Sequence, residues 1–283
     1  MVYRIVQLIL VTQLSTACQA QDLLTGEINA PCATKESSLR RVIPYPNLRE
    51  ADVLWARRIW SYIDLRQKMN HPLYYPLEPN NDNWALFDLI GYGLSHDWIT
   101  AYGLGPLQDD DEFRYPLTKE EVDSITRPKK TRYRERVEDG TMEAVESIEP
   151  LTAADVVGYM IKEDWLFDKQ RSQHVVRLIG LAPVVLRYSE TGEIKGSQPL
   201  FWLYYPECRY LFSPCEAYIG HSTAIHLSFD QLFTLRRYQA QIIKEDNVFD
   251  RAIDEYAKGM DALLEAERIK QTLFEWEHDL WTY

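Results

Sequence analysis

Apolar residues recur at helical spacing between residues 48 and 69, where one apolar stripe runs beside a polar stripe with the same rhythm. Prolines follow within a few residues and cannot continue a helix. The pattern therefore predicts a helix over residues 48–69 that is buried on more than one side. Its apolar stripe consists of Val53, Ala56, Trp60 and Ile63.

Two later segments show the same helical rhythm. Thr152 can cap a helix over residues 152–167, because Asp155 follows it at capping-box spacing. A last helix is predicted from about Val248 into the 270s. Its expected buried stripe consists of Ile253, Tyr256, Ala257, Met260, Leu263 and Leu264.

Between these helices the pattern changes to that of strands. Residues 174–188 are rich in β-branched side chains, and the uninterrupted apolar run in 199–212 is typical of a strand covered on both faces. The two segments predict an antiparallel hairpin, and capping residues at Ser213 and Ser228 indicate further helix starts. The predicted class is α+β, with several amphipathic helices packed around a small antiparallel β-sheet.

Two segments are poorer in apolar residues than their surroundings. Residues 21–47 contain several prolines and turn-forming residues, and we interpret them as an N-terminal arm or linker. Residues 106–150 combine an acidic run at 109–113 with a basic run at 127–136. We interpret this second segment as flexible and polar, within one α+β domain that covers residues 48–283.

Residues 1–20 have the layout of a secretory signal peptide. Arg4 precedes a short apolar run, and small residues lead to Ala20, after which we expect cleavage. Lipidation at Cys18 would instead leave an anchored protein, and a buried N-terminal helix is a further alternative. No other segment approaches the length of a membrane span, so we expect no direct span.

Charge argues against nucleic-acid binding. The chain has 31 basic and 43 acidic residues and a net charge of −12, which repels phosphates. The basic run is most simply a solvated loop, and a docking surface for an acidic partner is the second interpretation. Its candidate partner-binding residues are Arg127, Lys129, Lys130, Arg132 and Arg134.

Removal of a signal peptide would leave three cysteines, Cys32, Cys208 and Cys215. An odd number means that at least one thiol is free or pairs between chains. Cys208 and Cys215 could pair across a turn, which would stabilise the fold by about 2.5 kcal/mol. The pairing is left open by the sequence.

No motif predicts catalysis, a metal or a cofactor. The chain has six histidines, and the nearest approach to a metal motif is the pair at 221 and 226, whose spacing puts the rings on different helical faces. Nucleophile-elbow, Walker and dinucleotide-binding motifs are absent. We therefore expect no catalytic residue, no metal and no cofactor.

Several phrases of the sequence resemble one family. They are "READVLWARRIWSYIDLRQKMNHPLYYP", "IKEDWLFDKQRS", "VRLIGLAPV", "LFWLYYPECR", "SFDQLFTLRRYQAQIIKEDNVFDRAI" and "FEWEHDLW". In this order they resemble the GldN/PorN family of gliding-motility and type IX secretion proteins. The resemblance covers roughly residues 49–77 and 151–281, and Gln67 stands where the family pattern leads us to expect an acid.

The resemblance implies a non-enzymatic subunit of a multi-copy periplasmic ring, held at the outer membrane by a GldK/PorK-type lipoprotein. It also implies contact with a GldM/PorM-type motor protein. Tryptophan and arginine dominate protein interfaces, so Trp165, Arg171, Trp276 and Trp281 are candidate partner-binding residues. Alternatively, the group around Trp165 packs in a seam between two elements of the same chain and contacts no partner. The rival functions are a periplasmic hydrolase that uses a carboxylate or histidine, and a small-ligand-binding module.

Overall fold

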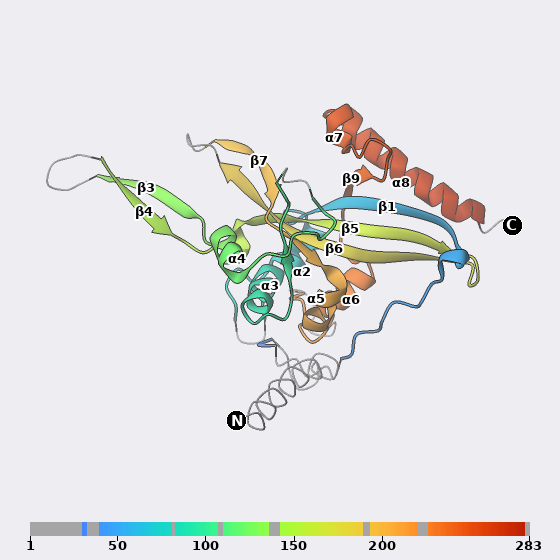
Figure 1. Cartoon of the computed structure of the whole chain (residues 1–283), viewed down its shortest axis with the longest axis horizontal. Helices are drawn as coiled ribbons and strands as arrows, with labels where there is room; N and C mark the ends of the chain where they lie inside the picture. The colour runs from blue at the N-terminus through green and yellow to red at the C-terminus, as the bar shows by residue number, and fades with distance from the viewer. Residues whose placement is uncertain are drawn as a thin grey trace, which may run out of the picture.

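The structure of the 283-residue chain is a computed structural model. It describes residues 30–32, 40–80, 83–106, 110–135, 142–188, 193–219 and 226–280. Figure 1 shows a curved sheet with α7 and α8 above it and other helices below it, and a two-stranded ribbon that projects from the body. The fold is α+β, as the sequence predicts.

The central element is an antiparallel sheet of seven strands. Six of them follow the order β2-β8-β6-β5-β1-β9, and β7 pairs with β6 beside β8. The long strands β1, β5 and β6 form its middle, where Ile59 lies opposite Glu163 and Ile161 opposite Leu181. The strands are β1 Val53–Asp64, β2 Ala101–Tyr102, β5 Val156–Asp168, β6 Gln173–Tyr188, β7 Ile194–Pro199, β8 Trp202–Tyr204 and β9 Gln241–Glu245.

The two helices predicted over residues 48–69 and 152–167 are wrong, because these segments form the neighbouring strands β1 and β5. Both faces of the sheet are covered, so Ile59 and Trp60 are each buried although they point to opposite faces. Burial on two faces removes the alternation that marks a strand, and the remaining spacing matches a helix by coincidence.

Two of the three predicted capping residues do cap an element, but only one of them begins a helix as predicted. Thr152 and Asp155 do form a capping box, but only a single 3-10 turn, Ala153–Asp155, begins there. Ser228 caps α6, with its Oγ accepting from the backbone N of Gln231 at 3.2 Å. No helix begins at Ser213, because this residue ends the preceding helix α5.

The strand predicted over residues 174–188 is confirmed as β6, whereas its predicted partner over 199–212 is mostly helical. Only Trp202–Tyr204 forms the strand β8, which pairs with β6 as expected. Pro206 then lies in the first turn of α5, where a missing N–H costs nothing. The residues between these two segments contain the strand β7.

Side chains of alternate strand residues point to one face of the sheet, which we call the helical face. Ile63, Tyr159, Ile161, Leu181 and Leu203 project from it into the main core. Helices α2, α3, α5 and α6 complete this core, with α5 and α6 lying together at its base in Figure 1. They span His71–Tyr74, Leu86–Ser95, Tyr205–Phe212 and Phe229–Thr234.

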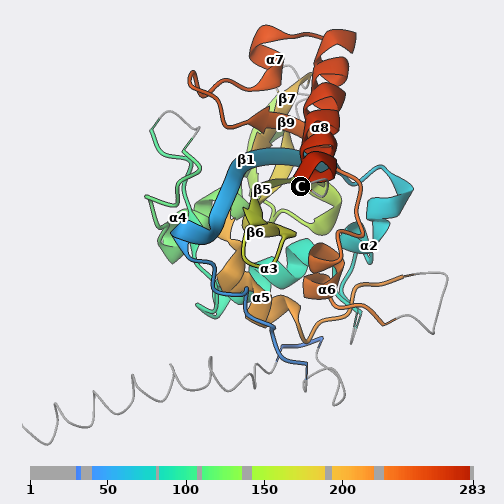
Figure 2. The same ribbon diagram turned by 90° about the vertical axis from the view of Figure 1, so that its right-hand side faces the viewer.

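A separate, smaller cluster lies on the same face near β1 and β9. It joins Ile59 of β1 to Ile253 of α7, and to Ala266, Ile269 and Leu273 of α8. The last helix predicted from the sequence is thus divided into α7 (Ile253–Tyr256) and α8 (Met260–Leu280). Figures 1 and 2 both show α8 lying along the β1–β9 end of the sheet.

The opposite face of the sheet is covered by a loop instead of helices. Trp60 and Lys162 both project from this face and contact Asp111 of the acidic run. The Lys162 ammonium, itself buried, donates to Asp111 Oδ1 at 3.1 Å and to the Asp111 carbonyl at 2.8 Å. Part of the segment predicted to be flexible is therefore bound to the sheet by a buried ion pair.

The rest of that segment contains α4 (Lys119–Thr126) and a ribbon of β3 (Lys129–Glu135) and β4 (Met142–Ile148). The ribbon projects from the body in Figure 1. Its base is closed by a hydrogen bond from Leu151 N to Thr126 O at 2.7 Å. The predicted flexibility of this segment stays a prediction.

The cysteines pair differently from the bridge considered between Cys208 and Cys215. Cys32 is bonded to Cys215, with 5.3 Å between their Cα atoms, and Cys208 is a buried free thiol. The possible bridge between Cys208 and Cys215 does not form, because Cys208 lies within α5 and its side chain is enclosed by the core, whereas Cys215 lies beyond the end of that helix. Burial also raises the pKa of the Cys208 thiol well above its usual range.

The described part of the predicted N-terminal arm is fixed to the body. Ala30 and Cys32 are buried in the main core, contrary to the expectation of an arm outside it. Further along, Arg40 Nη2 donates to Glu216 Oε1 at 2.7 Å, and the Arg209 guanidinium lies 4.7 Å from the ring centre of Tyr45. Residues 1–20, with the predicted signal peptide, lie outside the described residues.

Candidate docking surfaces

Trp165 lies in a seam within the chain, which was the alternative interpretation from the sequence. Its ring is partly buried and packs with the cluster under α8, and the Arg236 guanidinium lies 4.9 Å from the ring centre. Beneath it, buried Glu163 accepts hydrogen bonds from Arg236 Nη1 at 2.6 Å and Tyr238 Oη at 2.9 Å. Burial, together with the Glu163 charge, raises the pKa of Tyr238 well above its usual range, so the phenol keeps its proton.

The structure does not bring Arg171 into this seam. Arg171 lies in the turn between β5 and β6, where its Nη1 is 3.8 Å from Asp168 Oδ2. Asp168 Oδ1 accepts from the backbone N of Gln170 at 2.8 Å and so holds the turn. The cation that contacts Trp165 is Arg236, which the sequence analysis missed because the two residues are far apart in the chain.

Trp276 on α8 stacks on Trp55 of β1, with ring centres 6.0 Å apart and planes inclined by 19°. His174 extends this contact, because its ring centre lies 6.3 Å from Trp55 and 5.0 Å from Trp165. Trp276 therefore helps to attach α8, although its side chain remains partly exposed. The other tryptophan of this phrase, Trp281, lies outside the described residues.

The stripe predicted to bury α8 is largely on the outside of the helix. Ile253 of α7 is buried as expected, but Met260, Leu263 and Leu264 are exposed. The residues that face the sheet are Ala262, Ala266, Ile269 and Leu273. The sequence contains both stripes, and periodicity alone cannot tell which one meets the sheet.

The basic run falls on the projecting ribbon. Lys129, Lys130, Arg132 and Arg134 all belong to β3, and Arg134 lies opposite Glu143 of β4 in the register. Arg127 ends α4, with its Nε 3.9 Å from Asp123 Oδ1 in an exposed pair. Four of the five candidate cations thus lie on the ribbon, which projects away from α8 in Figure 1.

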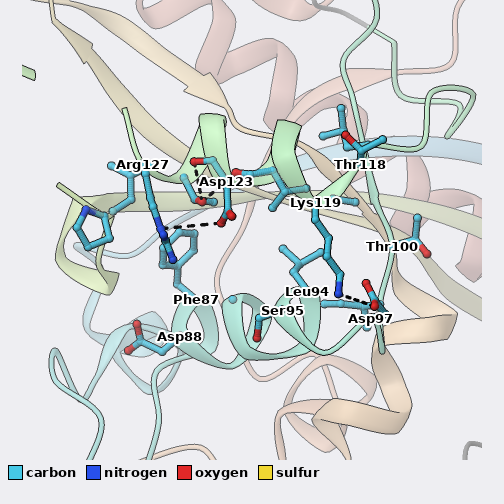
Figure 3. Close-up of a pocket in the computed structure, with 18 of the residues that line it drawn as sticks. Phe87, Asp88, Leu94, Ser95, Asp97, Thr100, Thr118, Lys119, Asp123 and Arg127 are labelled. Atoms are coloured by element: carbon cyan, nitrogen blue, oxygen red, sulfur yellow. Dashed lines mark hydrogen bonds and ion pairs between the residues drawn. The ribbon is translucent and has the colours of Figure 1, made fainter. Parts of the chain in front are cut away.

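A cleft of about 670 Å³ lies between α3 and α4. Figure 3 shows Lys119 and Asp97 in contact at one end of it, and Arg127 near Asp123 at the other. The Lys119 Nζ–Asp97 Oδ2 distance is 2.6 Å, but both side chains are largely exposed. Exposed pairs contribute about 0 to 1 kcal/mol, so the Lys119–Asp97 pair holds α4 over the cleft only weakly.

Asp88 lines this cleft, and the pKa of its carboxyl group is shifted. Burial raises its pKa to about 6. Its Oδ2 is enclosed by protein and has no hydrogen-bond partner. A carboxyl in this state exchanges protons close to neutral pH, which is a property shared by catalytic acids and by strained structural groups.

Ser95 and His96, beside the cleft, do not form an activated nucleophile. Ser95 Oγ lies 3.0 Å from His96 Nδ1, but both atoms also lie within 2.9 Å of the Tyr92 carbonyl oxygen. A carbonyl only accepts, so Nδ1 must carry a proton to bond it and then cannot remove the serine proton. The contacts complete the end of α3.

Within the described residues, histidine, cysteine, aspartate and glutamate form no group of three that could hold a metal ion. Among these same residues, no helix combines the length and apolar character that crossing a membrane requires.

Comparison with known families gives a match over nearly the whole chain. Residues 48–282 match the model of the family described as gliding motility associated protein GldN. A search of curated proteins found no significant match. The matched range includes the sheet, its helices and the projecting ribbon, so the chain belongs to the GldN family of gliding motility associated proteins.

Proposed function

We propose that the chain is a non-enzymatic structural subunit of a periplasmic ring in the type IX secretion and gliding machinery. In this proposal a GldK/PorK-type outer-membrane lipoprotein holds the ring, and a GldM/PorM-type motor protein contacts it. The observation that carries the proposal is the family match over residues 48–282, because it makes the chain a component of gliding motility and type IX secretion.

Two features of the fold support a periplasmic assembly role. The disulfide between Cys32 and Cys215 is typical of proteins that fold in an oxidising compartment, such as the bacterial periplasm. The projecting ribbon carries Lys129, Lys130, Arg132 and Arg134 on one strand, which suits attraction to an acidic surface of a partner. The described part of the N-terminal arm is bound to the body, so the ribbon is the better candidate for docking.

Cross-linking mass spectrometry on the complex co-purified from an envelope extract tests the proposal. We expect the lipoprotein and the motor to co-purify, with cross-links from the ribbon lysines Lys129 and Lys130. A variant in which Lys129, Lys130, Arg132 and Arg134 are all replaced by glutamine should lose these partners while its melting temperature is kept. Recovery of the wild-type chain only as a monomer would contradict the proposal.

The cleft between α3 and α4 is one place where either rival function could act. A hydrolase needs a nucleophile beside a free base, and the Ser95–His96 contact does not provide one. A ligand-binding module needs an enclosed apolar pocket, whereas this cleft is bordered by the exposed pairs of Lys119 and Arg127. Neither rival is favoured by a specific observation.

A further inference from the structure

The outer side of α8 carries four large apolar side chains of which half or more of the surface is exposed. We call Met260, Leu263, Leu264 and Phe274 the outer stripe. Their exposed fractions are 70%, 50%, 61% and 67%. Isolated exposed apolar residues are ordinary, but four on one side of one helix are of the kind that marks an interaction site, although Glu267 and Gln271 lie between Leu264 and Phe274.

The spacing of the outer stripe is that of a helix seam. Met260, Leu264, Glu267, Gln271 and Phe274 follow one another at intervals of four and three residues, which places them along one line of the helix. Successive residues are about 100° apart around an α-helix, so this line lies nearly opposite the buried positions that face the sheet. The outer stripe is therefore open along about four turns.

Charge on α8 indicates what can cover the stripe. The helix contains the acids Asp261, Glu265, Glu267, Glu275, Glu277 and Asp279 and the cations Arg268 and Lys270, so its side chains sum to 2 − 6 = −4. Both cations already pair within the helix: Arg268 Nη2 lies 2.6 Å from Glu265 Oε1, and Lys270 Nζ 3.7 Å from Glu267 Oε2. Of the acids that remain, Asp261 lies beside Met260 and Glu275 beside Phe274 in the sequence, near the two ends of the stripe.

We propose that the outer stripe of α8 binds an amphipathic helix of a partner protein, with apolar residues at intervals of three and four and lysine or arginine along its flanks. Such a helix would bury Met260, Leu264 and Phe274 in a shared seam, and its cations would lie beside the acids of α8. A second copy of this chain fits less well, because two acidic helices and two chains of net charge −12 repel each other.

This inference goes beyond the proposed function, because it needs only the helix α8 and neither the ribbon nor a ring. It can be tested with the purified full chain and a synthetic probe. The probe is a fluorescent peptide of leucine and lysine, about 18 residues long, with its leucines at helical spacing. The matched probe replaces every lysine by glutamate, which keeps the apolar stripe and reverses the charge.

Fluorescence anisotropy at about 0.15 M salt measures binding of both probes. We expect the lysine peptide to bind and the glutamate peptide not to bind. The double variant Leu264→Gln/Phe274→Gln should weaken binding of the lysine peptide about tenfold or more. Val248→Gln is the matched control, because Val248 is 98% exposed but lies outside α8, and it should leave the affinity unchanged.

Three outcomes would overturn the inference. Unchanged binding by the double variant would mean that the lysine peptide is attracted by charge alone. Equal binding of the two probes would mean that the acids play no part. A dimer of the wild-type chain, seen by light scattering and abolished by the double variant, would assign the stripe to a second copy. None of these results bears on co-purification of the machinery, so the two proposals can fail separately.

Discussion

Helices α3 and α8 pack on the same face of the sheet but use their apolar residues differently. Six of the ten residues of α3 are buried, so almost all of its hydrophobic surface lies in the main core. On α8, which has twenty-one residues, the buried positions in the described part are Ala266, Ile269 and Leu273, and apolar side chains of similar size remain outside. The apolar residues of α3 thus stabilise the core, whereas several apolar residues of α8 stay exposed and can contact another molecule.

The contrast also involves polar groups. Behind α3, the buried Asp230 carboxylate accepts from Arg209 Nε at 2.8 Å and Tyr205 Oη at 3.1 Å, within a core that includes the disulfide. Around α8 the ion pairs are mostly exposed, as between Arg268 and Glu265. Exposed pairs contribute little, so α8 depends on a few apolar contacts and on the Trp55–Trp276 stack.

The largest effect should come from the disulfide on the α3 side. It links residues separated by 183 positions. The double variant Cys32→Ser/Cys215→Ser should lose about 3 to 5 kcal/mol of unfolding free energy, because the unfolded chain regains the entropy of a very long loop. Urea denaturation followed by circular dichroism measures this loss.

Cys208→Ala is the control for the disulfide, because it removes a buried thiol and keeps the bridge. Cys208→Ala should lower the unfolding free energy by less than about 1.5 kcal/mol. Equal losses for the two variants would show that the bridge contributes no more than ordinary core packing.

Truncation of one apolar residue on each helix tests the contrast directly. Leu89→Ala on α3 should cost about 3 kcal/mol and lower the stability of the whole domain. Ile269→Ala on α8 should cost about 2 kcal/mol. It should mainly free α8, which hydrogen exchange would show as loss of protection in α8 before the sheet opens. If both variants unfolded in one step with the same exchange pattern, α8 would be as much a part of the core as α3.

A smaller, pH-dependent effect is expected at Asp88 on α3. Its pKa in the folded chain is raised to about 6 by burial, so ionising the carboxyl destabilises the folded state. Below about pH 4 the group is protonated in both states and has no effect. Asp88→Asn should therefore stabilise the protein by about 1 kcal/mol at pH 7.5, after discounting for partial exposure.

The gain from Asp88→Asn should disappear as the pH falls through 6 towards 4. Thermal melts at pH 4, 6 and 7.5 measure it, with Asp254→Asn on the surface as the matched control. A gain that is independent of pH would mean that the missing hydrogen bond, and not ionisation, is the source of the strain.

The smallest effect should come from the outer stripe itself. Leu264→Gln/Phe274→Gln removes two exposed side chains, so the unfolding free energy should change by less than about 0.5 kcal/mol. Urea denaturation checks this directly. A loss of several kcal/mol would show that these residues are buried within the single chain, and the contrast between α3 and α8 would then fail.

Part of the fold could be predicted from the sequence because its signals are local. The capping box of Ser228 and Gln231 and the β-branched run of β6 act over a few residues, and both predictions are confirmed. β1 and β5 were missed because their neighbours across the sheet decide their structure, and burial on both faces hides the alternation of a strand.

The candidate docking residues show the same limit. The partner of Trp165, which is Arg236, and the partner of Cys215, which is Cys32, are both distant in sequence and could not be chosen by spacing. On α8 the sequence contained two apolar stripes, and only the packing against Ile59 of β1 decides which one is buried. Family resemblance was recognisable because several separate phrases occur in one order.

The bond between Cys32 and Cys215 also determines a mechanical path. Tension that reaches Cys32 from the residues before it enters the chain again at Cys215, in the base of the molecule beside α5. When the other end of the chain is held beyond Cys215, the strands that lie between these two positions in the sequence carry none of this tension. Such a load would reach β9 and α8, which follow Cys215, before it reached β1, β5 or β6.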